Sequence, residues 1–393
     1  MRRTILLISR CPPYPLHLGD RLIIGNLFAQ LAARGYQTDL LAFSDRPSDL
    51  AEIKHYRAHF RHVSLLPDPP RTALDYLLRL RAPFPQRAEQ AWSPQMWQAI
   101  EAQLRQERYD VIHLFGGVQV YEYRHLVEPL PNLIVPYESY SLLLERQLAQ
   151  TRSIRQKIAL WLRWHMARRY ERLMFEGFGA VVVLTETDAA ALRSLAPHLP
   201  LRVIPNGVAL ERFKPQAPAE GAHLLFVGNY EYAPNLDAAL WLARDIFPRI
   251  KAREPEAELW LVGNGPPADL RAFADEAIHV TGHVPALEPY YARAALFLSP
   301  LRFGAGIKNK ILEAMAMALP VIATSLSLDG IAFAEGVRLA ETAADFAEQA
   351  CALLADAALR ARLGAANRAV IEAHYTWSAV ADAYESLYAQ LSR

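Results

Sequence analysis

Short apolar runs alternate with helical patterns along both halves of the chain. In the first half, the runs bounded by turn residues are 4–9, 38–43, 62–66, 111–114, 133–136 and 180–184. Helical patterns separate most of them, as in residues 22–33, where apolar positions recur at helical spacing until Arg34-Gly35 ends the helix. Buried strands that alternate with helices predict a parallel sheet with helices on both faces.

A second series of the same kind follows a Pro- and Ala-rich stretch at residues 214–221. Its apolar runs are 223–227, 258–262, 278–281, 295–298, 321–324 and 336–339. We therefore predict an α/β protein of two doubly wound, Rossmann-like domains, residues 1–200 and 201–375. Residues 376–393 should form an amphipathic helix that packs back on the first domain. Ligands of open parallel sheets bind beyond the carboxyl ends of the strands, so we expect the chemistry in a cleft between the domains.

Composition and charge exclude several classes of protein. The chain has 393 residues, 52% hydrophobic and 21% charged, which is typical of a globular protein and excludes wholesale disorder. Its 42 basic and 41 acidic residues give a net charge of +1, so no global field attracts it to nucleic acid. Cys11 and Cys351 match no metal or redox spacing, which favours a reducing, cytoplasmic setting. No apolar run is long enough to predict a membrane-spanning helix.

The most informative segment is SPLRFGAGIKNKILEAMA, residues 299–316. It follows an apolar strand, passes Gly304 and Gly306, and enters a helix. Glycines let the backbone approach an anion closely, and the first turn of a helix favours phosphate. Arg302 and Lys308 add two positive charges at the same place. The segment is therefore predicted to hold a diphosphate.

Glu313 lies about two turns into this helix, away from its apolar stripe. An ionised carboxylate there can accept hydrogen bonds from the two hydroxyls of a ribose, which beside a diphosphate would make a nucleotide site. The same residues also fit a solvated helix face with local ion pairs. The helix by itself does not distinguish the two interpretations.

The chain resembles the retaining glycosyltransferases of family 4, which have the GT-B fold of two Rossmann-like domains. The resemblance covers nearly the whole chain and is closest over residues 200–330. Within the segment described above it rests on EAMA (313–316), followed by PVIAT (320–324). The other motifs, in family order, are GD (19–20), VIPNGV (203–208), FVGN (226–229), LVGNGP (261–266) and GHV (282–284).

The resemblance implies a role for each matching position. Arg302 and Lys308 would hold the diphosphate and stabilise its charge as it leaves, while Glu313 would bind the ribose. His283 and Val284 would meet the base. Transfer would be a front-face displacement with no covalent enzyme intermediate and no metal. The donor-binding set implied in this way is Gly19, Asp20, Asn229, Gly263, Asn264, His283, Val284, Gly304, Ala305, Gly306 and Glu313.

The sequence departs from the family pattern at three places. Family members commonly carry two glutamates eight positions apart, and the earlier position holds Ala305, so contacts to the donor sugar would come from backbone. The Arg and Lys usual after the first strand of the second domain are replaced from Asn229 onward, which moves the diphosphate charge onto Arg302 and Lys308. The family often has a His near the donor sugar, and we expect Glu138 to take that role.

For two further residues, the sequence is compatible with both a functional and a structural role. His113 ends a predicted strand at the sheet edge and could be a catalytic residue, although a hydrogen-bonded structural histidine is the plainer interpretation. Asp20 could contact substrate or cap the helix that begins near Leu22.

Residues 151–175 combine many basic side chains with Trp161 and Trp164. A solvated arginine face with the tryptophans packed inward is the plainer interpretation. Peripheral contact with the inner face of an anionic membrane is the alternative, and it would suit a lipid-linked acceptor.

Together, these features predict a retaining, metal-independent hexosyltransferase without a cofactor. It would use a nucleotide diphosphate sugar and a saccharide or lipid-linked acceptor in cell-surface polysaccharide assembly. One alternative is a hydrolysing nucleotide-sugar epimerase or phosphorylase of the same fold, and another is a binding protein that has lost catalysis. A dehydrogenase is disfavoured because the first strand leads into PPYP (12–15), not into a GxGxxG turn.

Overall fold

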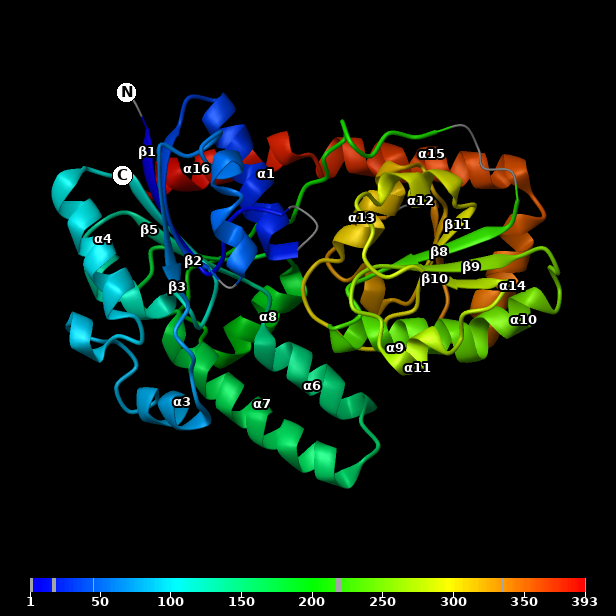
Figure 1. Cartoon of the computed structure of the whole chain (residues 1–393), viewed down its shortest axis with the longest axis horizontal. Coiled ribbons are helices and arrows are strands. Elements are labelled where there is room, and N and C mark those ends of the chain that lie inside the picture. Colours follow the sequence, from blue (N-terminus) through cyan, green and yellow to red (C-terminus); the bar gives the residue numbers. More distant parts are fainter. Residues whose placement is uncertain (1–2, 16–18, 45, 217–220, 334, 393) are drawn as a thin grey trace. The chain divides into compact units, whose positions relative to one another are not determined.

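The computed structural model describes residues 3–15, 19–44, 46–216, 221–333 and 335–392 (Figure 1). The chain divides into two compact units. Unit 1 comprises Met1–Asn206 and Trp377–Arg393, and unit 2 comprises Gly207–Thr376. Residues 217–220 of the Pro- and Ala-rich stretch lie outside the described part.

Unit 1 is built on a parallel sheet of seven strands in the order β3-β2-β1-β4-β5-β6-β7. The central strands are buried on both faces, as expected for a parallel sheet covered by helices. The strands are β1 Thr4–Ser9, β2 Gln37–Ser44, β3 His62–Pro67, β4 Val111–Phe115, β5 Asn132–Tyr137, β6 Val181–Val183 and β7 Leu201–Val203.

Helices cover both faces of this sheet. Side chains of α4, α7 and α8 join one buried cluster with alternate residues of β1, β4 and β5. The helices α1 and α16 pack against each other, and His113 of β4 contacts Phe28 of α1 and Tyr388 of α16, which places these helices on the opposite face. The helices are α1 Gly19–Ala33, α2 Ile53–Tyr56, α3 Ala73–Arg79, α4 Pro94–Gln106, α5 Arg124–Val127, α6 Tyr140–Gln150, α7 Ile154–Met174, α8 Glu186–Leu195 and α16 Trp377–Leu391.

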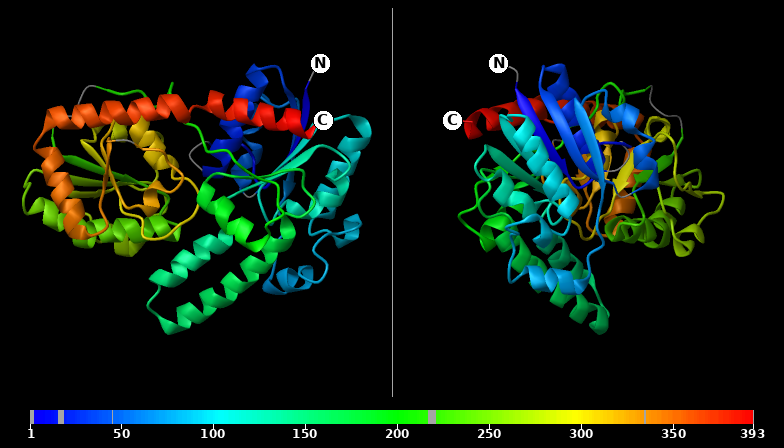
Figure 2. Two further views of the ribbon diagram at one scale, coloured as in Figure 1. Left: turned by 180° about the vertical axis from the view of Figure 1, so that it is seen from behind. Right: turned by 60° about the vertical axis from the view of Figure 1, so that its left-hand side comes forward.

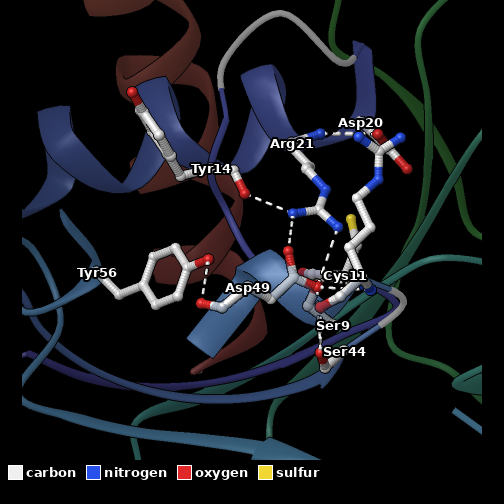
Figure 3. A network of polar contacts seen from close by, with 9 residues as sticks. Ser9, Cys11, Tyr14, Asp20, Arg21, Ser44, Asp49 and Tyr56 are labelled. Carbon is white, nitrogen blue, oxygen red and sulfur yellow. Dashed lines mark hydrogen bonds and ion pairs between the residues drawn. The ribbon is translucent and has the colours of Figure 1, made fainter. Parts of the chain in front are cut away.

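A buried ion pair fixes the segment between β1 and α1. Arg21 Nη1 lies 2.6 Å from Asp49 Oδ1, and each side chain is only 1% exposed. The same guanidinium donates to the carbonyl oxygen of Tyr14, while Ser44 Oγ and Tyr56 Oη donate to the Asp49 carboxylate and carbonyl (Figure 3). Because hydrogen bonds satisfy both charges, this network anchors residues 11–15 from within the core.

Unit 2 is built on a parallel sheet of six strands in the order β10-β9-β8-β11-β12-β13. The helix α14 packs with the segment from α9 to α10 over one face, and α12, α13 and α15 lie over the other. The strands are β8 His223–Val227, β9 Glu258–Val262, β10 Ile278–Val280, β11 Leu296–Ser299, β12 Val321–Ala323 and β13 Val337–Leu339. The helices are α9 Ala233–Trp241, α10 Phe247–Lys251, α11 Ala268–Arg271, α12 Glu288–Arg293, α13 Asn309–Ala316, α14 Ala343–Leu354 and α15 Ala357–His374.

Each sheet has a topological switch point, where chain order reverses between neighbouring strands. In unit 1 it lies between β1 and β4, and in unit 2 between β8 and β11. Ligands of doubly wound sheets bind beyond the carboxyl ends of such strands. The predicted fold class is confirmed, although the short strand β7 was not expected. Among the helices of the described residues, none has the length and apolar character needed to cross a bilayer.

Candidate functional site

The glycine loop of unit 2 connects the two elements that flank its switch point. Residues 300–308 leave β11 and enter α13, beside the segment that follows β8. Gly304 and Gly306 have φ values of 143° and 66°, which side-chain-bearing residues rarely adopt. The predicted order of strand, glycine loop and helix is therefore present at the place where ligands bind in this class of sheet.

Lys308 is buried in this loop and does not lie on a solvated helix face. It is 8% exposed, and its ammonium donates to the carbonyl oxygens of Ala305, at 3.1 Å, and Gly306. The interpretation of a solvated face is wrong for this residue and for Glu313, which is also 8% exposed. Ala305 is buried as well, and its methyl group carries no hydrogen-bonding atom.

Glu313 is oriented by Tyr291, a fully buried tyrosine of α12. The phenol donates to Glu313 Oε2 at 2.9 Å. Burial raises the pKa of the Glu313 carboxyl to about 7, and the Tyr291 hydrogen bond opposes that rise. Near neutral pH this carboxylate can accept hydrogen bonds from a ligand, which would favour its ionised form.

Lys310 connects α13 to the segment after β8. Its ammonium donates to Asn235 Oδ1, and Asn235 Nδ2 donates to the carbonyl of Asn229 at 2.9 Å. Burial, together with the charge of Lys308, lowers the pKa of Lys310 to about 7. Lys308 at the amino-terminal end of α13 and two residues within the helix, Lys310 and Glu313, thus form one electrostatically linked group.

Arg302 makes different contacts from this group. Its guanidinium forms a bidentate pair with Asp237 of α9, with N–O distances of 2.8 and 2.5 Å, and it lies 5.1 Å from the centre of the Trp241 ring. The structure therefore does not join Arg302 to the contacts of Lys308 and Glu313. Its predicted role on the diphosphate stays a prediction, and any such role must coexist with the Asp237 pair.

Two glycines allow the loops after β8 and β9 to pack closely. A Cβ on Gly263, whose φ is 145°, would lie 1.8 Å from the carbonyl oxygen of Gly228. The backbone of Asn264 accepts a hydrogen bond from Tyr230 N at 2.8 Å. The close packing of the two loops thus explains why position 263 is a glycine, whether or not it contacts a ligand.

The two residues predicted at the base follow the edge strand β10. His283 is exposed and Val284 is half-buried. Their roles at the base stay predictions.

His113 is not placed to act as a catalytic residue. It is fully buried, its Nδ1 lies 2.8 Å from Tyr388 Oη, and its ring packs on Tyr384 and Phe28. Burial lowers its pKa to about 3. These contacts favour the structural interpretation, because α1 and α16 cover the side chain, and the catalytic role stays a prediction that this burial opposes.

The other predicted residues of unit 1 lie near the carboxyl ends of its strands. Glu138 follows β5 and is half-buried. Gly19 and Asp20 form the first turn of α1, and Asp20 pairs with Arg10 at 3.4 Å. Neither Arg10 nor Tyr291 was expected, since their partners are distant in sequence. Within the described ranges, no group of three His, Cys, Asp or Glu side chains is placed to hold a metal ion.

Two protein-family models match the chain, one on each unit. Glycosyltransferase Family 4 matches residues 23–212, and Glycosyl transferases group 1 matches residues 221–356. Each unit therefore carries a glycosyltransferase signature.

Curated relatives include the phosphatidyl-myo-inositol mannosyltransferases of Mycobacterium tuberculosis (strain ATCC 25618 / H37Rv) and Mycolicibacterium smegmatis. The first is 29% identical over 211 residues, which is 47% of this chain and 53% of the relative. The second is 30% identical over 207 residues, 48% of this chain and 52% of the relative. The chain thus spans about half the length of the curated relatives it matches.

Solved structures match over nearly the whole chain. A sucrose-phosphate synthase from Thermosynechococcus elongatus has a TM-score of 0.73 at 21% identity and covers 99% of both chains. The Anabaena protein HepE, solved with UDP and glucose, has a TM-score of 0.64 at 13% identity and covers 99% of this chain and 100% of its own. At these identities the likeness shows the fold alone.

Proposed function

This chain belongs to glycosyltransferase family 4, and on that premise we propose that it transfers a hexose from a nucleotide diphosphate sugar with retention of anomeric configuration. The acceptor is a saccharide or a lipid-linked acceptor of cell-surface polysaccharide assembly. The observation that carries the proposal is the group of Lys308, Lys310 and Glu313 at the switch point of unit 2. It combines positive charge for a diphosphate with a carboxylate for the neighbouring ribose.

In the proposed reaction the acceptor hydroxyl oxygen bonds to the anomeric carbon on the face that the diphosphate leaves. The bond from that carbon to the diphosphate oxygen breaks, and the hydroxyl proton passes to the departing oxygen. Lys308 and Lys310 stabilise the charge that develops on the diphosphate. Because side chains would supply this positive charge, we propose that neither a metal ion nor a cofactor takes part.

A thermal-shift screen over nucleotide sugars tests donor binding, because a bound ligand raises the melting temperature with its concentration relative to Kd. The selected donor is then supplied with saccharide and lipid-linked acceptors. Lys308→Ala should lower kcat more than donor affinity, whereas Glu313→Ala should mainly weaken donor binding. Activity should persist in EDTA, and activity that is lost in EDTA and restored by Mn2+ would contradict metal independence.

The alternatives give different outcomes. Rapid donor consumption without any acceptor would indicate a hydrolysing epimerase. Donor binding without transfer to any acceptor would indicate a binding protein, a role that the alanine at position 305 leaves open. No stabilisation by any nucleotide sugar would overturn the proposal.

We further propose that α7 rests on an anionic membrane, which brings the enzyme to a lipid-linked acceptor. Four apolar side chains of α7 are exposed, with Ile154 at 75%, Ile158 at 57%, Trp161 at 48% and Leu162 at 54%. The inward packing expected for the tryptophans holds for Trp164, which packs on Leu144 and Leu160, but not for Trp161.

The arrangement of α7 favours a membrane as the occupant of this face. Positions 154, 158, 161 and 162 lie on one helix face, and the basic side chains Arg155 and Lys157 flank it on either side. Figure 2 shows α6 and α7 side by side as a helical pair extending away from the sheet of unit 1. An apolar stripe among basic residues suits the boundary between acyl chains and anionic headgroups.

Vesicle co-sedimentation tests this contact. Binding should appear with phosphatidylglycerol in the vesicles and fall at least fivefold in the double variant Ile158→Ser/Trp161→Ser. Leu74→Ser is the matched control, because Leu74 of α3 is 62% exposed. Sedimentation that does not depend on anionic lipid, or that the control reduces equally, would overturn the membrane proposal and leave the donor proposal untouched.

A further inference from the structure

Arg10 lies at the topological switch point of unit 1. It follows β1 directly, and its backbone N–H donates to the carbonyl of Phe115, at the end of β4, at 2.9 Å. Its guanidinium donates to Oη of Tyr137, the last residue of β5, and pairs with Asp20 in the first turn of α1. Four neighbouring segments thus place one cation beyond the carboxyl ends of the central strands.

The backbone is irregular at Tyr137, which holds this side chain through its hydroxyl. Tyr137 has φ of 57°, unusual for a residue with a side chain, and the pairing of β5 with β6 shifts register between Ile134 and Tyr137. This irregularity stacks the Tyr137 ring on Phe115 at 5.5 Å and brings its hydroxyl to Arg10. Strained backbone of this kind clusters at functional sites.

Gly116 allows Arg10 to occupy its position. Its φ is 122°, and a Cβ there would lie 2.8 Å from Arg10 Cβ. An alanine would therefore have to displace the arginine side chain. The strain at Tyr137 and the glycine at position 116 both serve the placement of the same guanidinium.

A purely structural role does not account for this arrangement. Arg21 already anchors residues 11–15 through Asp49, and that pair is 1% exposed on both sides. The Arg10 side chain, in contrast, is 29% exposed. Among contacts to described residues, Tyr137 and Asp20 engage two of its terminal N–H groups, and a guanidinium carries five. It therefore retains donors on a side open to a ligand.

We propose that Arg10 is a substrate-binding residue that donates hydrogen bonds to phosphoryl oxygens. This rests on the proposed function, whose substrates carry phosphate on the donor and, where the acceptor is lipid-linked, on the acceptor as well. A planar guanidinium held at two corners suits bidentate binding of phosphate. Tyr137 and Gly116 are positioning residues that act through Arg10.

The experiment compares Arg10→Met, Arg10→Lys and Gly116→Ala with wild type. Arg34→Met is the matched control, since Arg34 is 22% exposed and pairs with Asp382 and Glu385, away from the switch point. For each full-length variant we would measure melting temperature, calorimetric Kd of the donor selected by the screen, and KM of the acceptor. Inorganic diphosphate is titrated in parallel as a probe that does not require a sugar.

Arg10→Met should weaken binding of one substrate about 10- to 100-fold, the loss typical of charge-assisted hydrogen bonds. A raised donor Kd identifies the donor diphosphate as the ligand, and a raised acceptor KM with unchanged donor Kd identifies the acceptor phosphate. Arg10→Lys should recover part of the lost affinity, because lysine keeps the positive charge but lacks the planar guanidinium that binds phosphate in a bidentate way. Gly116→Ala should weaken binding of the same substrate, although the charge of Arg10 is retained.

Changes within twofold in donor Kd and acceptor KM, with only the melting temperature lowered as in Arg34→Met, would overturn the proposal. If wild type binds no nucleotide sugar, the proposed function fails separately. The diphosphate titration then decides the role of Arg10, since affinity for that probe should fall at least tenfold in Arg10→Met, and equal or absent binding by both proteins would overturn it.

Discussion

The hydroxyl of Tyr291 donates a 2.9 Å hydrogen bond to Oε2 of Glu313, which joins α12 to the helix that follows the glycine loop. Both side chains are buried, and the same phenol lies 3.2 Å from the carbonyl oxygen of Lys310. The tyrosine thus fixes the carboxylate and the first turn of α13 together. Donor binding should depend on this link in ways that several measurements can separate.

Donor affinity should depend on pH through Glu313. Burial raises the pKa of this carboxyl to about 7, so the group becomes protonated as pH falls through 7. If the ionised form binds the ribose hydroxyls, protonation of Glu313 should raise donor Kd as pH falls from 8 to 6, while protonation of Lys310, whose pKa is also about 7, acts on the diphosphate in the opposite direction. Calorimetry of wild type and Glu313→Gln across this range separates the two effects. Glu313→Gln should bind more weakly at pH 8 and keep only the Lys310 effect, a donor Kd that falls as pH falls, and a profile identical to that of wild type would contradict the assignment.

Tyr291→Phe should shift this pH profile upward. Loss of the phenol removes a hydrogen bond that stabilises the ionised carboxylate, so the pKa of Glu313 should rise further. The melting temperature should fall modestly, because one buried hydrogen bond contributes about 1 kcal/mol. Calorimetry at pH 6, 7 and 8 checks the shift. Tyr290→Phe is the control, since Tyr290 neighbours it in α12 and its ring packs on Trp260 instead of Glu313. Equal shifts in both variants would refute the link.

Gly263→Ala should destabilise unit 2 by more than about 2 kcal/mol. The new Cβ would overlap the carbonyl of Gly228 at 1.8 Å, so the loop after β8 must move. Gly282→Ala is the matched control, because φ there is 73° and a Cβ meets nothing within 4 Å. The control should lose about 1 kcal/mol from backbone strain alone. Urea unfolding of both variants measures the difference. Equal losses in the free energy of unfolding would show that the loop after β8 can move away from the new Cβ without cost.

Arg21→Met should cost about 3–5 kcal/mol, because it leaves the Asp49 carboxylate buried without its partner. Arg21→Met/Asp49→Leu should recover much of that loss, since no uncompensated charge remains. Urea unfolding compares the two. A double variant less stable than the single one would mean that the hydrogen bonds of Asp49 to Ser44 and Arg46 dominate.

Apolar patterning was sufficient to predict the two sheets. Strands such as β1 and β8 are buried on both faces and read as unbroken apolar runs, so their positions follow from the sequence. The three-residue β7 is half-exposed, and its apolar signal is too short to separate from the loop. The fold class and the positions of most strands therefore follow from local information that the chain carries clearly.

The candidate site was predictable only where its residues are close in sequence. Lys308 caps α13 and Glu313 lies within it, and their burial excludes a solvated helix face. Tyr291 and Arg10 were not predicted, because their partners Glu313 and Tyr137 lie 22 and 127 positions away. Nor does the sequence indicate the left-handed backbone of Tyr137, which depends on a register shift between two strands. Such pairings arise from tertiary packing, which a local pattern does not encode.

The last helix of the chain, α16, covers His113 at the centre of the first sheet. Along the sequence, the roughly 170 residues of unit 2 separate α16 from the rest of unit 1. During synthesis on a ribosome, Tyr384 and Tyr388 emerge after the strands of both units. One apolar face of the first sheet therefore stays open to the solvent or to chaperones until α16 has been synthesised, whereas the continuous stretch Gly207–Thr376 can fold as soon as it has left the exit tunnel. Truncation within α16 would leave that face uncovered and make the nascent protein prone to aggregation.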